Sequence, residues 1–293
     1  MILKQRPREQ TVIAERTYDC EPTLTDHQVV DFCKNGFVML KAVVPAEINR
    51  RALAFLDQHP QMEPDEILEE DWFVDGVIKH PQAAGAVRSL LGKRFKLPPK
   101  MSNHRVQCPR RWPCGWHRDG GAIDSPQLHS LQVFYYPQDV PIALGPTQLL
   151  PGSHMLNTKR RFMTHYGGIR CAVSSAAAAG SIFITHYSIW HRATTATASG
   201  IRNLLKYNYW RTAAPQRDWV VDPNIDFAQV DMSPFGGILD KHFCVQVARQ
   251  LIWLCGLGEN FEYKGGQSWP MSAGPDSECT EGLPPQLRRI SGS

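Results

Sequence analysis

The segment Trp116-His117-Arg118-Asp119 constrains this chain most, because it sets a histidine and an aspartate two positions apart. Side chains alternate along an extended strand, so His117 and Asp119 point to the same side and can reach one point in space. Such a pair supplies half of a metal site. The chain has 11 histidines, so a pair of this kind also arises by chance, and the assignment depends on the rest of the sequence.

A third ligand is predicted at His191, which ends the β-like run Ile182-Phe183-Ile184-Thr185-His186-Tyr187-Ser188-Ile189-Trp190. Two histidines and one carboxylate on one face of an octahedron leave three positions open, an arrangement typical of non-haem Fe(II). Zinc prefers a closed tetrahedron or a single open position. The ligand set therefore favours iron.

Arg202 lies eleven residues after His191, on the next predicted strand. A guanidinium holds a carboxylate through two parallel hydrogen bonds, and burial does not remove its charge as readily as that of a lysine. This arginine is suited to bind the far carboxylate of 2-oxoglutarate. A turn and short strand, residues 145–154, lie between the two histidine segments and end in Leu-Pro-Gly-Ser-His.

Together these segments resemble the phytanoyl-CoA dioxygenase family of Fe(II)- and 2-oxoglutarate-dependent oxygenases. The resemblance spans roughly residues 20–260 in chain order, and it includes residues 24–28 and 35–40 besides the motifs above. It implies an all-β core with flanking helices, a cupin-like double-stranded β-helix or jelly roll. It also implies that Fe(II) is bound by His117, Asp119 and His191. 2-Oxoglutarate would be held by Arg202, and O2 would be the second co-substrate.

Three other histidines compete with His191 for the role of distal ligand. His154 closes a Pro-Gly-Ser-His turn, where a histidine more naturally bonds to the backbone, and His165 lies in a polar loop. His186 is the serious rival. Only His191 has an arginine at the spacing seen in the family, so we assign the metal to His191.

The predicted strand over residues 128–136 offers further candidates, because Gln132, Phe134 and Tyr136 share one of its faces. The resemblance places the co-substrate pocket along this strand, which makes Gln132 and Tyr136 candidate contacts of 2-oxoglutarate. Asn103, with His104, is a weaker candidate on the preceding strand. Phe134, for which plain packing is equally expected, joins Trp116 and Trp210 as a candidate substrate contact.

The chain divides into one domain with two flanking segments. We expect an N-terminal arm at 1–23, a single dioxygenase domain at 24–262 and a C-terminal tail at 263–293. Within the domain, 24–97 is expected to be helical support, 98–215 the jelly-roll core and 240–257 a C-terminal helix. The acidic stretch 60–75 is expected to be a solvated loop, with an entrance loop over the site as the alternative.

Composition limits the partners that we expect. A net charge of +4 is too small and too scattered for a nucleic-acid stripe, and no apolar run approaches the roughly twenty residues of a membrane span. Eight cysteines show no Cys-x-x-Cys spacing, and the N-terminus lacks an apolar signal region. Cys108 and Cys114 could pair or bind metal, but isolated packed thiols are commoner. We expect a cytoplasmic enzyme, monomeric or homodimeric, that acts on a small molecule.

The reaction expected from the resemblance is hydroxylation of an unactivated C–H bond, with release of succinate and CO2. Asp119 argues against halogenation, because a halide needs the position that a carboxylate would fill. Desaturation, cyclisation and epoxidation use the same site and stay open. Two other classes are a metal hydrolase with the same ligands and a non-catalytic jelly-roll binding protein.

Overall fold

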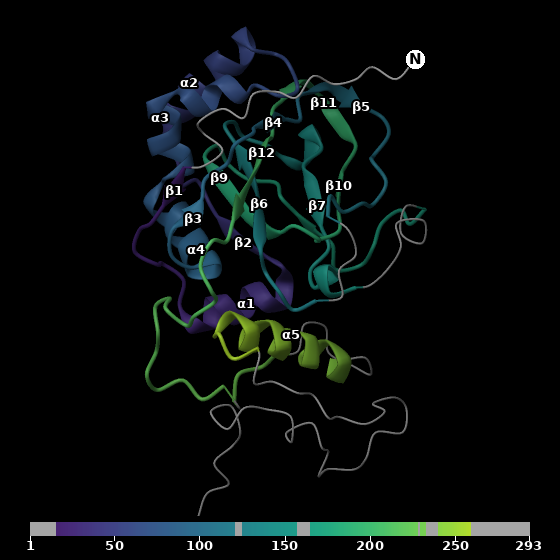
Figure 1. The fold of residues 1–293 in the computed structure, drawn as a ribbon. Coiled ribbons are helices and arrows are strands. Elements are labelled where there is room, and N and C mark those ends of the chain that lie inside the picture. Colours follow the sequence, from purple (N-terminus) through teal and green to yellow (C-terminus); the bar gives the residue numbers. More distant parts are fainter. Residues whose placement is uncertain (1–15, 121–124, 157–164, 228, 233–239, 259–293) are drawn as a thin grey trace, which may run out of the picture.

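Two layers of antiparallel β-sheet form the core of the computed structural model, which describes residues 16–120, 125–156, 165–227, 229–232 and 240–258 (Figure 1). The larger sheet has the strand order β1-β3-β12-β6-β9-β2, and β4 also pairs with β12. These strands are β1 Thr17–Tyr18, β2 Phe37–Leu40, β3 Phe95–Lys96, β4 Ser102–Asn103, β6 Ser130–Tyr136, β9 Ser181–His186 and β12 Leu205–Trp210.

The second layer is made of two small sheets beside the larger one (Figure 1). One has the order β10-β7-β8, with β7 Thr147–Leu149, β8 Val173–Ser174 and β10 His191–Ala193. The other pairs β5 Val106–Arg110 with β11 Ala196–Arg202. The predicted jelly-roll class is confirmed.

Strand β6 divides the interior into two cores, because its side chains alternate between the faces of the sheet. Leu131, Val133 and Tyr135 belong to the large core beneath the helices. Phe134 and Tyr136 pack in a second core between the sheets, where their neighbours are Leu149, Phe183, Ile189 and Leu204. The two faces predicted for this strand are therefore correct, and the second face is the one that runs toward His191.

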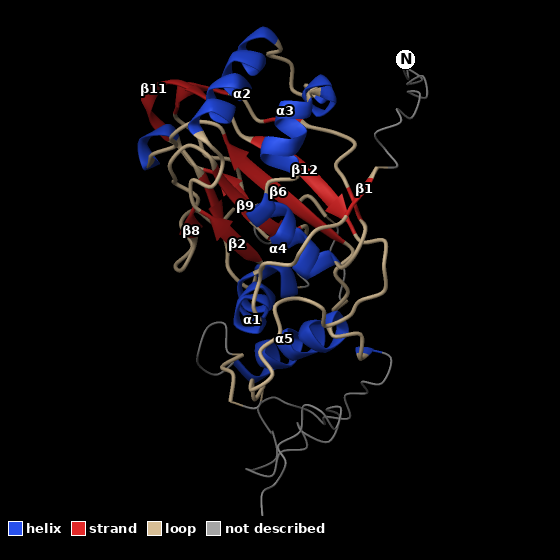
Figure 2. Cartoon of the chain, turned by 90° about the vertical axis from the view of Figure 1, so that its left-hand side faces the viewer, coloured by secondary structure: helices blue, strands red, loops and turns tan. Residues whose placement is uncertain are grey.

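Helices cover the outer face of the larger sheet (Figure 2). They are α2 Ala46–Gln58, α3 Asp71–Phe73 and α4 Pro81–Leu91. Helix α1 Asp26–Asn35 lies at one end of the sheets, where α5 Asp240–Leu254 packs against it (Figure 1). Thr25 caps α1 through a hydrogen bond from the Gln28 N–H. Gly36 ends α1 with φ 80°, a left-handed conformation that glycine adopts at no steric cost.

The acidic stretch is not the solvated loop that its charge suggested. It contains a 3₁₀ helix at Asp65–Glu69, α3 and the start of a π-helical segment at Val74–Ile78. Further 3₁₀ helices lie elsewhere in the chain, at Ile142–Leu144 and Ser153–Met155. Ile67 and Phe73 are fully buried, so apolar side chains between the acids anchor the segment to the core. Asp65 accepts a hydrogen bond from the Met101 N–H, 2.8 Å away.

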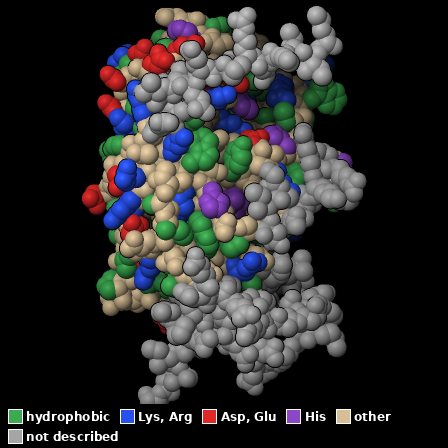
Figure 3. Space-filling model, in the orientation of Figure 1, with side chains coloured by type: hydrophobic (Ala, Val, Ile, Leu, Met, Phe, Trp, Pro, Cys, Tyr) green, Lys and Arg blue, Asp and Glu red, His purple; other side chains and the backbone are tan. Residues whose placement is uncertain are grey.

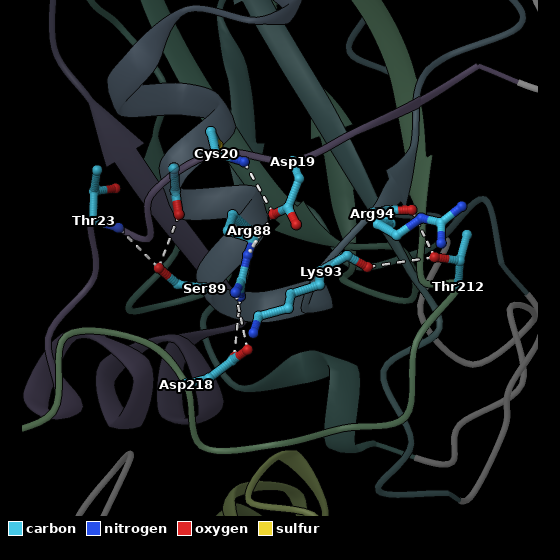
Figure 4. A network of polar contacts seen from close by, with 10 residues as sticks. Asp19, Cys20, Thr23, Arg88, Ser89, Lys93, Arg94, Thr212 and Asp218 are labelled. Atoms are coloured by element: carbon cyan, nitrogen blue, oxygen red, sulfur yellow. Dashed lines mark hydrogen bonds and ion pairs between the residues drawn. The ribbon is translucent and has the colours of Figure 1, made fainter.

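Arg88 of α4 ties distant parts of the chain together (Figure 4). Its guanidinium is buried; it donates to Asp19 Oδ1 over 2.8 Å and to both oxygens of Asp218 over 3.0 and 2.9 Å. A bidentate pair of this kind is strong and geometrically specific. The end of the predicted N-terminal arm is thus held in place, and it contributes β1, whereas residues 1–15 and the predicted tail 263–293 lie outside the described residues.

Strand pairing connects the parts into which the domain was divided. Strand β2 comes from the part assigned to helical support, yet it pairs with β9 and forms one edge of the larger sheet. The predicted strand that carries Asn103 is interrupted, because β4 and β5 are separate strands that join different sheets. In the described part of the chain, no helix has the length and apolar character needed to cross a membrane.

Candidate metal centre

His117 and His191 are joined by an isolated antiparallel bridge between their backbones. The His117 N–H donates to the His191 carbonyl over 3.0 Å, and the His191 N–H donates back over 2.8 Å. This exchange brings the two imidazoles side by side, with ring centroids 4.4 Å apart. The bridge links the end of the loop after β5 to the start of β10, so two stretches distant in sequence present their histidines together.

Both imidazoles use Nδ1 in a hydrogen bond to a backbone carbonyl two residues earlier. His117 Nδ1 lies 2.9 Å from the Gly115 oxygen, and His191 Nδ1 lies 3.0 Å from the Ile189 oxygen. A carbonyl only accepts, so each Nδ1 carries the proton and each Nε2 keeps its lone pair. Hydrogen bonding of the second ring nitrogen orients histidine ligands in metal sites.

Asp119 completes the group, and the three candidate ligand atoms all lie within 4.8 Å of one another. Asp119 Oδ1 is 3.9 Å from His117 Nε2, and Oδ2 is 3.6 Å from His191 Nε2. Oδ2 accepts hydrogen bonds from Gln132 Nε2, at 2.8 Å, and from Lys206 Nζ. The arrangement can hold a divalent cation through two imidazoles and one carboxylate.

The charges around the group favour its metal-binding protonation states. Burial raises the pKa of Asp119, but the Lys206 charge, the electrostatic influence of His191 and the hydrogen bonds from Lys206 and Gln132 together outweigh it, so the pKa lies well below its ordinary value. Burial, with the nearby Lys206 charge, lowers the pKa of His191 to about 3. At neutral pH the carboxyl is therefore ionised and the imidazole neutral, which are the forms that bind metal.

Arg202 is buried, with 2% of its surface exposed, and it is incompletely partnered. Nη1 donates to the Gly145 carbonyl, while Nε has no hydrogen-bond partner. Within the described residues no carboxylate forms an ion pair with it. Gly145 has φ 66°, and a Cβ there would lie 2.8 Å from the Thr194 oxygen, so glycine fits this close approach. An unpaired buried guanidinium is a ready site for a carboxylate.

The other predicted co-substrate residues lie at different distances from the group. Gln132 contacts Asp119 directly. The hydroxyl of Tyr136 bonds to Ser175 Oγ over 2.8 Å. The Tyr136 side chain lies close enough to Arg202 to influence its guanidinium electrostatically. Asn103 Nδ2 donates to Asn203 Oδ1 over 3.0 Å, so it supports the turn after Arg202.

His104, the weakest candidate, feels charges from both ends of the proposed co-substrate site. Burial lowers its pKa to about 4, and the charges of Lys206, Asp119, Arg202 and His117 also act on it. Its backbone N–H donates to the Leu204 carbonyl over 2.9 Å. His104 also lines the cavity that exposes Asp119.

The three candidate substrate contacts have separate environments. Phe134 packs 5.5 Å from the His191 ring and is fully buried. Trp210 lines a cavity of about 410 Å³ that also exposes Asp119. Trp116 is buried in a cluster with Leu150 and Trp190 and does not line that cavity, so its position favours packing.

The competing histidines lie outside the group of three. His154 Nε2 donates to the Cys33 carbonyl over 3.1 Å, as the turn suggested. The His186 ring lies against that of His154, with centroids 4.9 Å apart and planes tilted by 35°, and its Nδ1 accepts from the Ser188 N–H over 3.1 Å. His165 is exposed. Cys108 and Cys114 are both free thiols, and Arg110 donates to the Cys114 sulfur.

Lys206 is the site residue that sequence reasoning missed. Its Nζ bonds to Asp119 Oδ2, lies 3.2 Å from His191 Nε2 and lies 5.1 Å from the Phe134 ring centroid. The alternation in β12 carried a signal, because Lys206, Asn208 and Trp210 share one face of the strand. In the sheet Lys206 pairs with Phe134, and Asn208 pairs with Gln132.

The family model for phytanoyl-CoA dioxygenase matches residues 32–204, more than half of the 293-residue chain. The chain belongs to this family. It is thus a 2-oxoglutarate-dependent oxygenase, an enzyme class that uses Fe(II) and O2. No curated protein sequence matches the chain.

Solved structures share the fold of this family member at low identity. HygX from Streptomyces hygroscopicus, with nickel and 2-oxoglutarate bound, is 16% identical with a TM-score of 0.54, covering 67% of this chain and 90% of its own. AviO1 from Streptomyces viridochromogenes is 15% identical with a TM-score of 0.51, covering 66% and 98%. SnoK, an alpha-ketoglutarate-dependent carbocyclase from nogalamycin biosynthesis, is 18% identical with a TM-score of 0.50, covering 75% and 98%.

Proposed function

We propose that this dioxygenase hydroxylates an unactivated C–H bond of a small molecule, with 2-oxoglutarate as co-substrate. The observation that carries the proposal is the convergence of His117, Asp119 and His191 from separate stretches of the chain. The two unprotonated Nε2 atoms and the ionised carboxylate fit Fe(II), and the three remaining positions of an octahedron fit a chelating co-substrate and O2.

Different residues of the site bind the metal, orient its ligands and hold the co-substrate. His117, Asp119 and His191 hold the metal, and the carbonyls of Gly115 and Ile189 fix the two imidazole tautomers. Ferrous iron with 2-oxoglutarate and O2 would supply the oxidising chemistry, with succinate and CO2 as co-products. Arg202 holds the 5-carboxylate, because its buried Nε and its charge lack a partner within the described structure. Gln132 keeps Asp119 oriented through Oδ2.

Desaturation, cyclisation and epoxidation remain alternatives on the same ligands. SnoK, which shares the fold, is a carbocyclase, so cyclisation is the alternative with a structural parallel. A metal hydrolase is disfavoured because it has no use for an unpaired arginine such as Arg202. Location in the cytoplasm and a monomeric or homodimeric state stay predictions.

The test is anaerobic titration with Fe(II) and 2-oxoglutarate, followed by admission of oxygen and measurement of succinate. We expect succinate that depends on both iron and 2-oxoglutarate. His191→Ala should abolish it, and His186→Ala, which removes the rival outside the group, should keep most of it. Loss in His186→Ala with retention in His191→Ala would overturn the assignment, and turnover of a hydrolysable substrate without O2 would favour the hydrolase.

A further inference from the structure

A cavity of about 410 Å³ opens beside Asp119, within the size range of small-molecule sites. Its charged lining is unbalanced, since Lys100 and Lys206 face one carboxylate, Asp119, which the metal needs. Ser102, Asn208 and Trp210 add polar groups and an aromatic wall. On the face shown in Figure 3, histidine side chains reach the surface near the middle, and Lys and Arg side chains are scattered over the same face.

Lys206 projects from β12 into this region and is nearly enclosed, with 9% of its side chain exposed. Its ammonium has three donors; one is directed at Asp119 Oδ2 and another at His191 Nε2, 3.2 Å away. Both partners are metal ligands. The aliphatic stem is packed, so the ammonium cannot simply withdraw into solvent, and it lies over the Phe134 ring.

Metal binding changes what Lys206 can contact. The Nε2 lone pair of His191 then goes to the metal, so it can no longer accept a hydrogen bond from the lysine. A dication held by Asp119 and His191 would also repel the ammonium, because Lys206 contacts both ligands. Lys206 would then keep Asp119 Oδ2 at most, and its other donors would be left to the cavity that it lines. A buried cation with free donors is costly unless an anion meets it.

The charge balance points the same way. A divalent metal, Arg202 and Lys206 are opposed by Asp119 and the dianionic 2-oxoglutarate, which leaves one positive charge before Lys100 is counted. We infer that the primary substrate carries an anionic group, a carboxylate in preference to a phosphate, that binds Lys206 in this cavity. This inference rests on the proposed function. It makes Lys206 a residue that selects the substrate and sets which carbon faces the metal.

The test measures binding, not turnover, on the full chain loaded with Ni(II) and 2-oxoglutarate. The probes are phenylacetate, 3-phenylpropanoate and 4-phenylbutanoate, each compared with its neutral amide and with phenyl phosphate, by calorimetric titration. We expect at least one acid to bind tenfold or more tightly than its amide and more tightly than the phosphate. The acid preference should be smaller without metal, because Lys206 is then held by His191.

Lys206→Met should erase the acid preference, and Lys206→Arg should restore part of it. The matched control is Lys96→Met on β3, which pairs with Trp210 of β12 but does not line the cavity, and it should keep the full preference. Thermal unfolding verifies that each variant is folded.

Equal binding of acids and amides, a preference that survives Lys206→Met, or an equal preference without metal would overturn the inference. A loss of 2-oxoglutarate affinity alone in Lys206→Met would assign the lysine to the co-substrate and also overturn it. Failure of 2-oxoglutarate to bind the metal-loaded wild type would refute the proposed function instead, which the first titration shows separately.

Discussion

His117 and His191 hold each other through main-chain atoms, because each N–H donates to the other's carbonyl. The backbone bridge is independent of the imidazoles, so the geometry of the site is built by the fold before any metal binds. Preformed sites of this kind require little rearrangement on binding.

The bridge predicts that His117→Gln separates folding from metal binding. We expect the free energy of unfolding of the metal-free variant to lie within about 0.5 kcal/mol of the wild-type value, because a substitution that leaves the backbone pairing intact costs little stability. The stabilisation that excess Ni(II) gives the wild type should be lost in the variant. Thermal unfolding with and without metal measures both, and a large loss of stability without metal would contradict the backbone account.

Arg202→Lys is expected to raise the KM for 2-oxoglutarate with a smaller effect on kcat. A lysine keeps the charge but loses the planar fork, and a hydrogen bond to a charged group contributes roughly 1.5–3 kcal/mol, or about 10- to 100-fold in affinity. Succinate release at varied 2-oxoglutarate concentration measures the effect. An unchanged KM would remove Arg202 from the co-substrate site.

Gln132→Met tests whether the amide positions Asp119. The substitution keeps the side-chain length but removes the donor to Asp119 Oδ2. Loss of a partner that orients a metal ligand typically costs about 10- to 100-fold in metal affinity, and we expect a loss of that order. Ni(II) titration gives the affinity, and Gln138→Met, at a glutamine that bonds to Ile201 and Asn203 and not to Asp119, serves as the control. Wild-type affinity in Gln132→Met would show that Lys206 alone orients the carboxylate.

Stability should fall as the pH is lowered from 6.5 toward 4, partly because of His154. Burial lowers the pKa of this histidine to about 4 in the folded state, so the unfolded chain binds the proton more readily across this window. At pH 5.5 this difference in proton binding lowers the free energy of unfolding by roughly 1 kcal/mol relative to neutral pH. Urea unfolding at pH 7.5 and 5.5 should show a smaller pH-dependent loss in His154→Gln, and an identical loss in both proteins would contradict the assignment.

Local patterns in the sequence already determined much of the structure. Thr25 and Gly36 bound α1 because capping and left-handed backbone are local properties. The alternation along residues 130–136 separated the two faces of β6, since the period of a strand is visible in sequence. The prediction of His117, Asp119 and His191 as ligands depended on the resemblance to the family, which decided between His191 and His186, and the structure brings the three residues together.

Tertiary structure alone decided which groups complete the site. Lys206 and Asp119 are 87 positions apart in the chain, and they meet because β12 pairs with β6, whose Gln132 bonds to the same carboxylate. The acidic stretch is helical because Ile67 and Phe73 pack in the hydrophobic core. The pattern of charges does not reveal this packing. Trp116 packs in one buried cluster with Trp190. Long-range pairing and burial depend on the whole fold, whereas caps, turns and strand periodicity depend on a few neighbouring residues.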